Sequence, residues 1–256
     1  MDRSFLSDNA VIGASRDFVC IRTATYEDKE EAEFLRSTFL GRAGGDLRNF
    51  GYCILSPDGK QKLRRSQRGP NFEYLDSAEM ARDLERFADQ FPAKPSAKAS
   101  PHRLPQMKSV RLGINVASCD GLPSVVVVGK DQDEVDQWKK QLSAVIWDES
   151  LIGKFIYAST TDSADLESVA GAGSKTGILV IRPDPFGLTG ELIQAIDKKL
   201  SPTALKKALT QAAKKFSRDP KSHGEHVRNG RRSGKSWETE VPVPESRRGR
   251  RSGRAQ

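Results

Sequence analysis

The three cysteines are the residues whose chemistry can be judged first. Disulfide exchange needs an attacking thiolate and a second thiol near enough to resolve the mixed disulfide. Cys20, Cys53 and Cys119 lie far apart, form no Cys-x-x-Cys pair and, with three histidines, give no zinc-ligand spacing. Cys20 and Cys53 sit in apolar stretches and are expected to be buried, whereas Cys119, in VASCDGLP, is the candidate reactive thiol. The sequence therefore predicts no catalytic residue, no cofactor, no metal site and no disulfide-reductase activity.

Arginine offers a second chemistry, the binding of phosphate groups. From Ser217 onward the chain has eleven Lys and Arg against five Asp and Glu, a net charge of +6, whereas the first 216 residues carry +2. This segment has too few apolar residues to offset its ordering entropy, so residues 217–256 are predicted to be disordered. The candidate polyanion-binding residues are Arg231, Arg232, Arg247, Arg248, Arg250 and Arg251. The alternative is an extension that serves only solubility.

The length and composition of the whole chain suit two modest domains. The chain has 256 residues, 36% of them hydrophobic and 30% charged. No apolar run approaches the roughly 20 residues of a membrane span, and the N-terminus lacks the apolar core of about 7–15 residues of a signal peptide. As given, the chain is expected in the cytoplasm, or in a secreted or periplasmic setting if a signal peptide precedes Met1.

Residues 1–91 are predicted to form a domain with the order strand, helix, strand, strand, helix. Strands are assigned from β-branched and aromatic residues, and helices from capping residues followed by apolar side chains at helical spacing. The predicted elements are a strand at 18–24, a helix opened by Asp28 and Glu31 that stops near Gly41, strands at 50–55 and 61–66 about a Ser-Pro-Asp-Gly turn, and a helix opened by Asp76 and Glu79.

Residues 92–106 hold four prolines without apolar periodicity and are predicted to be a linker. Residues 107–216 are predicted to form a second domain, and residues 217–256 the tail. The predicted elements of the second domain are strands at 110–116 and 124–128, a helix carrying Val135, Trp138, Leu142 and Val145, a strand at 154–158, a short helix at 166–170, strands at 177–181 and 191–196 about Pro183-Asp184, and a last helix opened by Ser201-Pro202.

The two Pro-Asp turns suggest one structural unit used twice. The closing helix begins 20 residues after Pro57 and 18 residues after Pro183. A strand-turn-strand-helix end occurs in many α+β domains, but the helix and strand that precede it favour an α/β fold of tandem thioredoxin-like domains, each a mixed sheet flanked by helices. The alternative is another type of mixed sheet.

The start of the chain resembles a thioredoxin-like family. In MDRSFLSDNAVIGASRDFVCIRTATYED, seven residues match the pattern that follows the redox motif in that family: Asp2, Arg3, Phe5, Asp8, Val11, Phe18 and Val19. The resemblance covers most of residues 1–91 and, more loosely, 122–216. It implies a central strand that leads into a Cys-x-x-Cys pair at a helix N-terminus, where the helix dipole lowers the pKa of the attacking thiol.

Both copies depart from this pattern at the positions that do the chemistry. In the first copy the dithiol and the central strand would lie before Met1. In the second, Gly129-Lys130-Asp131 follows the strand at 124–128 where cysteines would stand. Neither copy has the family's cis-proline before the hairpin, where Arg48-Asn49-Phe50 and Lys175-Thr176-Gly177 stand instead.

Without a central strand, the strands at 18–24 and 50–55 would have unpaired edges, and three arrangements would avoid this. The strands at 18–24 and 50–55 pair directly, or the strand at 110–116 fills the gap, or the true start lies upstream, which we favour because the family match begins just after the dithiol position.

Three functions follow from these observations. The leading hypothesis is a non-catalytic, redox-inactive thioredoxin-fold protein that binds or scaffolds a protein partner, which the sequence does not identify. One alternative is a thiol–disulfide oxidoreductase whose Cys-x-x-Cys lies upstream of Met1. Another is a nucleic-acid-associated protein that acts through its Arg-rich tail. The fold does not decide among them.

Overall fold

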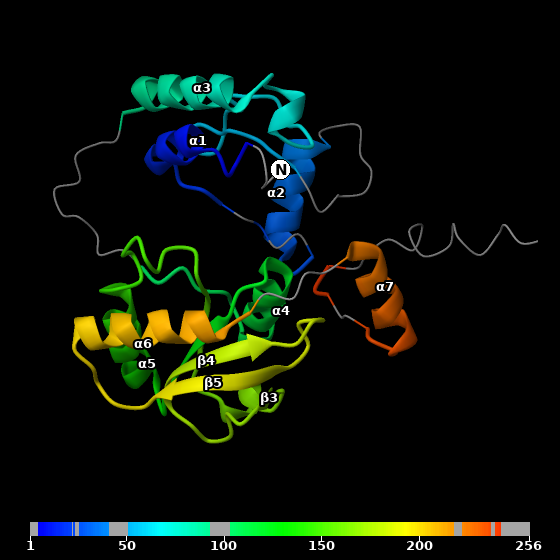
Figure 1. The fold of residues 1–256 in the computed structure, drawn as a ribbon. Helices are drawn as coiled ribbons and strands as arrows, with labels where there is room; N and C mark the ends of the chain where they lie inside the picture. The colour runs from blue at the N-terminus through cyan, green and yellow to red at the C-terminus, as the bar shows by residue number, and fades with distance from the viewer. Residues whose placement is uncertain are drawn as a thin grey trace, which may run out of the picture. The chain divides into compact units, whose positions relative to one another are not determined.

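The protein is a mixed α/β protein, shown in Figure 1 as a computed structural model that describes residues 5–21, 23, 26–40, 51–92, 103–217, 222–236 and 239–241. The chain divides into two compact units. The first unit is Met1–Ala97 with Trp237–Gln256, and the second unit is Lys98–Ser236.

The second unit is built on a five-stranded mixed sheet in the order β2-β1-β4-β5-β3. β1 (Ser124–Val128) lies between β2 (Ile156–Thr160), which is parallel to it, and β4 (Gly177–Pro183), which is antiparallel. β5 (Gly190–Ile196) returns antiparallel to β4, and the short β3 (Val169–Ala170) pairs in parallel with β5. The β1 sequence Ser-Val-Val-Val-Val is buried throughout, as its continuous apolar run predicts for a central strand.

Helices cover both faces of this sheet. Val125 and Val127 of β1 belong to one core cluster with side chains of α5 (Gln132–Ser143) and α6 (Pro202–Lys215). Val126 and Val128 point to the other face and belong to a second cluster with side chains of α4 (Val110–Asp120). The alternation along β1 therefore produces three layers, with the sheet between α4 and the α5–α6 pair. The 3-10 helix η4 (Ser163–Leu166) precedes β3.

The first unit is mostly helical in the described residues. Its elements are α1 (Asn9–Ala14), the 3-10 helix η1 (Ser15–Asp17), α2 (Lys29–Phe39), the 3-10 helix η3 (Pro70–Phe72) and α3 (Ser77–Gln90). Between α2 and α3 the chain reverses at a turn whose Gly59 amide donates to the Ser56 carbonyl over 2.8 Å. The arms on either side meet at two isolated bridges, Tyr52 with Gln67 and Leu55 with Lys62. α1, α3 and this hairpin share one apolar core that includes Val11, Ile54 and Phe87.

Several predicted helix starts are confirmed by their capping bonds. Asp28, Asp76 and Ser201 each accept a hydrogen bond from the backbone amide three residues later, at the start of α2, α3 and α6. The predicted strands at 124–128, 154–158, 177–181 and 191–196 correspond to β1, β2, β4 and β5. The Pro-Asp hairpin of the second unit is therefore a pair of regular strands.

The predicted strand at 110–116 is wrong, because these residues belong to α4. The Ser109 hydroxyl caps this helix by accepting from the Leu112 amide over 3.2 Å. Val110, Ile114 and Ala117 follow at helical spacing and are all buried. Residues 110–116 therefore do not supply the additional strand that was one of the three possibilities for the domain at residues 1–91. The short helix predicted at 166–170 is also corrected, since η4 ends at Leu166 and β3 begins at Val169.

The predicted strand at 18–24 is absent at residues 18–21 and 23, the members that are described. Val19 and Ile21 are 88% and 80% exposed. High β-propensity does not make a strand without a paired neighbour and a face to bury. The strands predicted at 50–55 and 61–66 form the bridged hairpin instead of a regular ladder, with residue 50 outside the described residues.

Parts of two segments predicted to be unstructured are ordered. Leu104 and Gln106, inside the predicted linker, join the second unit: Leu104 is buried in its core and Gln106 bridges to Tyr157 of β2. In the predicted tail, residues 223–232 form helix α7 (His223–Arg232), and the Val241 amide donates to the Tyr26 carbonyl of the first unit over 2.9 Å. For these residues the prediction of disorder is corrected.

Candidate functional site

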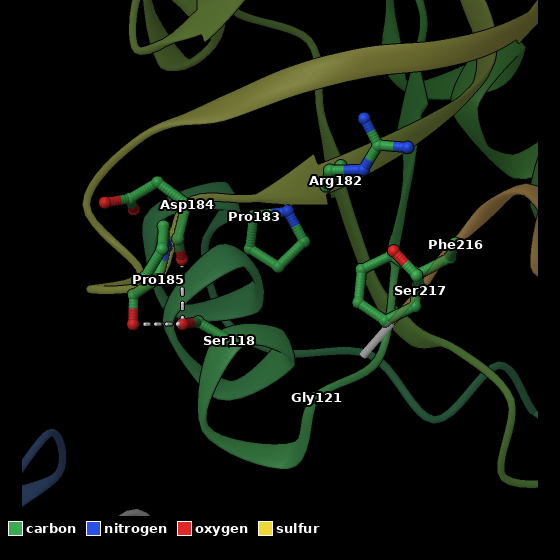
Figure 2. Close-up of a pocket in the computed structure, with 8 residues that line it drawn as sticks. All are labelled: Ser118, Gly121, Arg182, Pro183, Asp184, Pro185, Phe216 and Ser217. Atoms are coloured by element: carbon green, nitrogen blue, oxygen red, sulfur yellow. Dashed lines mark hydrogen bonds between the residues drawn. The ribbon is translucent and has the colours of Figure 1, made fainter. Parts of the chain in front are cut away.

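A small pocket lies at the turn end of the β4–β5 hairpin (Figure 2). Its lining comes from the end of α4, the end of β4 and the segment after α6, and consists of Ser118, Gly121, Arg182, Pro183, Asp184, Pro185, Phe216 and Ser217. Its volume of about 40 Å³ has room for a few water molecules. Pockets for small-molecule substrates are several hundred Å³, so this pocket does not suit such a ligand.

The hairpin turn beside this pocket is held firmly by Asp184. One carboxylate oxygen of Asp184 accepts from the amides of Leu188 and Thr189 over 2.7 and 3.0 Å, and the other accepts from the Phe186 amide over 3.2 Å. The Ser118 hydroxyl of α4 lies within hydrogen-bond distance of the Asp184 and Pro185 carbonyls, at 2.9 and 3.1 Å (Figure 2). The turn therefore presents the Phe186 ring from a fixed backbone.

Helix α7 packs on this turn through the Phe186 ring. The rings of Phe186 and His226 are stacked, with centroids 4.8 Å apart and planes 24° apart. Of the predicted polyanion-binding residues, Arg231 and Arg232 occupy the last turn of α7 and are exposed. Arg247, Arg248, Arg250 and Arg251 lie outside the described residues.

The turn from β1 into α5 is the position where the sequence resemblance would place a dithiol and where Gly129-Lys130-Asp131 stands instead. Asp131 caps α5 by accepting from the Glu134 amide over 2.8 Å, and Glu134 in return accepts from the Lys130 amide over 2.8 Å. The turn is tight, since a Cβ on Gly129 would lie 2.8 Å from the Val135 backbone nitrogen. Carboxylates thus interact with the first amides of the helix, where a thiolate would otherwise gain the same stabilisation.

The cysteines differ from their predicted environments. Cys20 is exposed rather than buried, because the segment around it is not part of a strand. Cys53 is half-buried in the hairpin of the first unit, and Cys119 is exposed, as predicted, near the end of α4. In the residues that the structure describes, no group of three or more His, Cys, Asp or Glu side chains could hold a metal ion.

A charged network in the first unit is the other candidate for chemistry. Asp83 of α3, which is 6% exposed, accepts from Arg64 over 2.6 and 2.8 Å, from Arg86 over 2.5 Å and from the Tyr74 hydroxyl over 2.8 Å. Burial favours the neutral acid, but the bonds from Arg64, Arg86 and Tyr74 together lower the pKa of Asp83 to about 2. So weak a base accepts protons poorly at neutral pH, and the network is therefore structural.

Sequence reasoning missed the residues that dock and extend α7: Phe186, His226, Arg228 and Lys235. The prediction of disorder for residues 217–256 rests on amino-acid composition, which is not sensitive to helix-capping residues. Ser222 and Glu225 have the spacing of a capping box, and Gly234 follows the helix where a C-terminal glycine is expected. These two signals could have located α7. The contact with Phe186 joins residues 40 positions apart and has no local signal.

No protein-family model, curated protein or solved structure matches this chain. Across the described residues, no helix combines the length and the apolar character that crossing a membrane requires.

Proposed function

We propose that this chain is a thioredoxin-like protein without dithiol chemistry that binds or scaffolds a protein partner. The arrangement of the second unit supports the thioredoxin-like assignment. β1 is flanked by β2, the strand after the following helix, and by β4, the first strand of the hairpin. This is the neighbourhood that the sequence resemblance implies for the strand leading into the redox motif.

The observation that carries the proposal is the N-terminus of α5. A thiolate at a helix N-terminus is stabilised by free amides and by the positive end of the helix dipole. In this chain Asp131 and Glu134 accept from the amides of Glu134 and Lys130. Nearby carboxylates also disfavour a thiolate. A binding role is therefore favoured over thiol exchange at this position.

The first unit supports the binding of a protein partner. Among the described residues of this unit, seven large apolar side chains are exposed: Leu6, Ile12, Val19, Ile21, Phe34, Phe72 and Leu75. Among those of the second unit, the exposed ones are Trp147 and Ile152. Val19 and Ile21, two residues apart, are the strongest pair among them at 88% and 80% exposed, and neighbouring exposed apolar side chains are typical of interaction surfaces. We therefore assign partner binding to the first unit.

An insulin-reduction assay tests the absence of thiol chemistry. The full chain, with dithiothreitol as reductant, is expected to reduce insulin at the rate of a variant with Cys20, Cys53 and Cys119 all changed to Ser, and no faster than buffer. An active dithiol oxidoreductase serves as the positive control. A wild-type rate clearly above that of the triple variant would contradict the proposal.

Capture from cell extract tests the binding role. The wild-type chain is compared with Val19→Asp/Ile21→Asp and with a control of equal charge, Ala78→Asp/Gln90→Asp, which changes two exposed residues of α3. We expect proteins that are retained by the wild type and the control and lost with the Val19/Ile21 variant. Identical retention by all three chains would show that Val19 and Ile21 do not contribute to partner binding.

A further inference from the structure

Helix α7 is attached to the second unit through one face. The His226 ring stacks on Phe186, and one turn later Gly230 is buried against the same ring, where a Cβ would lie 3.1 Å from a Phe186 ring carbon. The ring that α7 contacts is carried by a turn whose amides donate to Asp184, so α7 packs on a well-fixed part of the hairpin.

The opposite face of α7 carries the positive charge. At about 100° of rotation per residue, the mean direction of Arg228, Arg231 and Arg232 lies about 170° around the helix from that of His226 and Gly230. All three arginines are exposed. The docking contact with Phe186 thus directs the three guanidinium groups away from the second unit.

A fourth cation, Lys235, follows the end of α7. The helix end is closed by backbone hydrogen bonds, so the charged side chains are not needed to cap it. Gly234 has a φ of 62°, and its amide donates to the Arg231 carbonyl over 3.2 Å. The Lys235 amide donates to the Gly230 carbonyl over 2.9 Å. This pair of backbone bonds satisfies the last carbonyls of the helix. Within the described part of the chain, no ion pair or side-chain hydrogen bond engages Arg228, Arg231, Arg232 or Lys235.

We propose that the α7 basic face, defined as Arg228, Arg231, Arg232 and Lys235, binds the phosphate backbone of nucleic acid without sequence preference. At 1.5 Å per residue, the helical part of this face, from Arg228 to Arg232, spans about 6 Å, close to two phosphate steps of one strand at about 3.4 Å each, so its three arginines match three successive phosphates. Lys235, beyond the helix end, adds a contact to a fourth. Guanidinium groups pair with phosphate oxygens through two parallel hydrogen bonds.

The composition of α7 favours nucleic acid over a lipid surface. Val227 is the only large aliphatic residue in the helix, and it is half-buried. A helix that binds a membrane needs an apolar face to insert among the lipids, and the remaining face of α7 is occupied by Phe186. This inference does not depend on the proposed function of the thioredoxin-like unit.

The test is fluorescence anisotropy of a labelled mixed-sequence 20-base-pair duplex with the full chain, as a function of salt. Changing Arg228, Arg231, Arg232 and Lys235 to Gln is expected to weaken binding about 100- to 1,000-fold at 0.1 M salt and to lower the slope of log Kd against log salt by about 3–4. The matched control changes four other exposed cations of the second unit to Gln, namely Lys130, Lys140, Lys175 and Lys198. It has the same net charge and should weaken binding less than about 5-fold.

Phe186→Ala separates the docked helix from a flexible basic segment. It leaves all four cations in place, so the salt slope is expected to persist while affinity falls about 3- to 10-fold, because α7 must then be ordered on binding. Equal losses from the α7 variant and the Lys control would overturn the proposal. So would unchanged binding by the α7 variant, or tighter binding to vesicles of phosphatidylserine than to the duplex.

Discussion

The two hairpins share a Pro-Asp turn but are stabilised by different interactions. In the second unit, β4 and β5 form a ladder of six residue pairs, and the run Ile178 to Ile181 is fully buried. In the first unit, the arms meet at two isolated bridges, and Arg64 of the return arm is fixed to Asp83 of α3. The same type of turn is therefore stabilised by buried apolar side chains in one unit and by an ion pair to a neighbouring helix in the other.

The difference begins in the second arm of each hairpin. The arm after Pro57 reads GKQKLRRSQR and has one large apolar residue, Leu63, whereas β5 reads GELIQAI. An arm with so little apolar surface cannot cover a sheet face. Its Arg64 instead reaches a buried carboxylate, and Ser66 donates to the Thr38 carbonyl at the end of α2 over 2.7 Å.

The largest expected effect is on the apolar hairpin. Leu179→Ala removes a fully buried side chain from β4 and should lower the free energy of unfolding of the second unit by about 3–5 kcal/mol. Leu63→Ala in the first unit should cost only about 1 kcal/mol, because this side chain is partly exposed. Urea unfolding followed by circular dichroism measures both, and in a Trp237→Phe background the fluorescence of Trp138 and Trp147 follows the second unit alone. Equal losses of unfolding free energy would show that the two hairpins depend on buried apolar side chains to the same extent.

The next largest effect is on the charged network. Asp83→Asn leaves Arg64 and Arg86 without their carboxylate and should destabilise the first unit by about 2–3 kcal/mol, less than a fully buried pair because both arginines reach solvent. Asp89→Asn, on an exposed position of the same helix, is the control and should change stability by less than about 0.5 kcal/mol. A similar small change from both variants would show that the network is not what holds the first hairpin.

The same network predicts how stability changes with pH. The pKa of Asp83 is lowered to about 2 in the folded protein, below its ordinary value of 3.8, so the ionised carboxylate favours the folded state. Its contribution is complete above about pH 4 and is lost as the pH falls through about 2. Urea titrations of the first unit at pH 5 and pH 2 should therefore show the gap between wild type and Asp83→Asn narrowing at the lower pH. A gap of constant size would contradict the assigned pKa.

The smallest effect concerns a single hydrogen bond. Tyr74→Phe removes the hydroxyl that donates to Asp83 over 2.8 Å and keeps the buried ring. The expected loss is about 1 kcal/mol in the first unit, since Asp83 keeps its two arginines. A double-mutant cycle with Asp83→Asn measures the coupling. A coupling near zero would remove Tyr74 from the network.

The elements that the sequence predicted correctly are those with local signals. Capping residues located α2, α3 and α6, and continuous apolar runs located β1 and β4. Residues 110–116 were misassigned because their β-branched residues outweighed the Ser109 cap. At residues 18–21 the β-branched residues predict a strand. No strand forms there, because a strand also needs a pairing strand from another part of the chain.

The candidate sites divide in the same way. The absence of cysteines between β1 and α5 is visible in the sequence, as are the arginines of α7. The docking of α7 on Phe186 and the network around Asp83 are not visible, because each joins residues from separate elements through tertiary packing. The composition of the tail therefore predicts its positive charge but not the packing of α7 against Phe186.

Native-state hydrogen exchange tests the contrast between the hairpins most directly. We predict that β4 amides exchange only through unfolding of the whole second unit and are unchanged by Asp83→Asn. The hydrogen-bonded amides of Tyr52, Leu63 and Gln67 should open at a lower free energy, and Asp83→Asn should reduce that energy further. Equal protection in both hairpins, with no response to Asp83→Asn, would contradict the account.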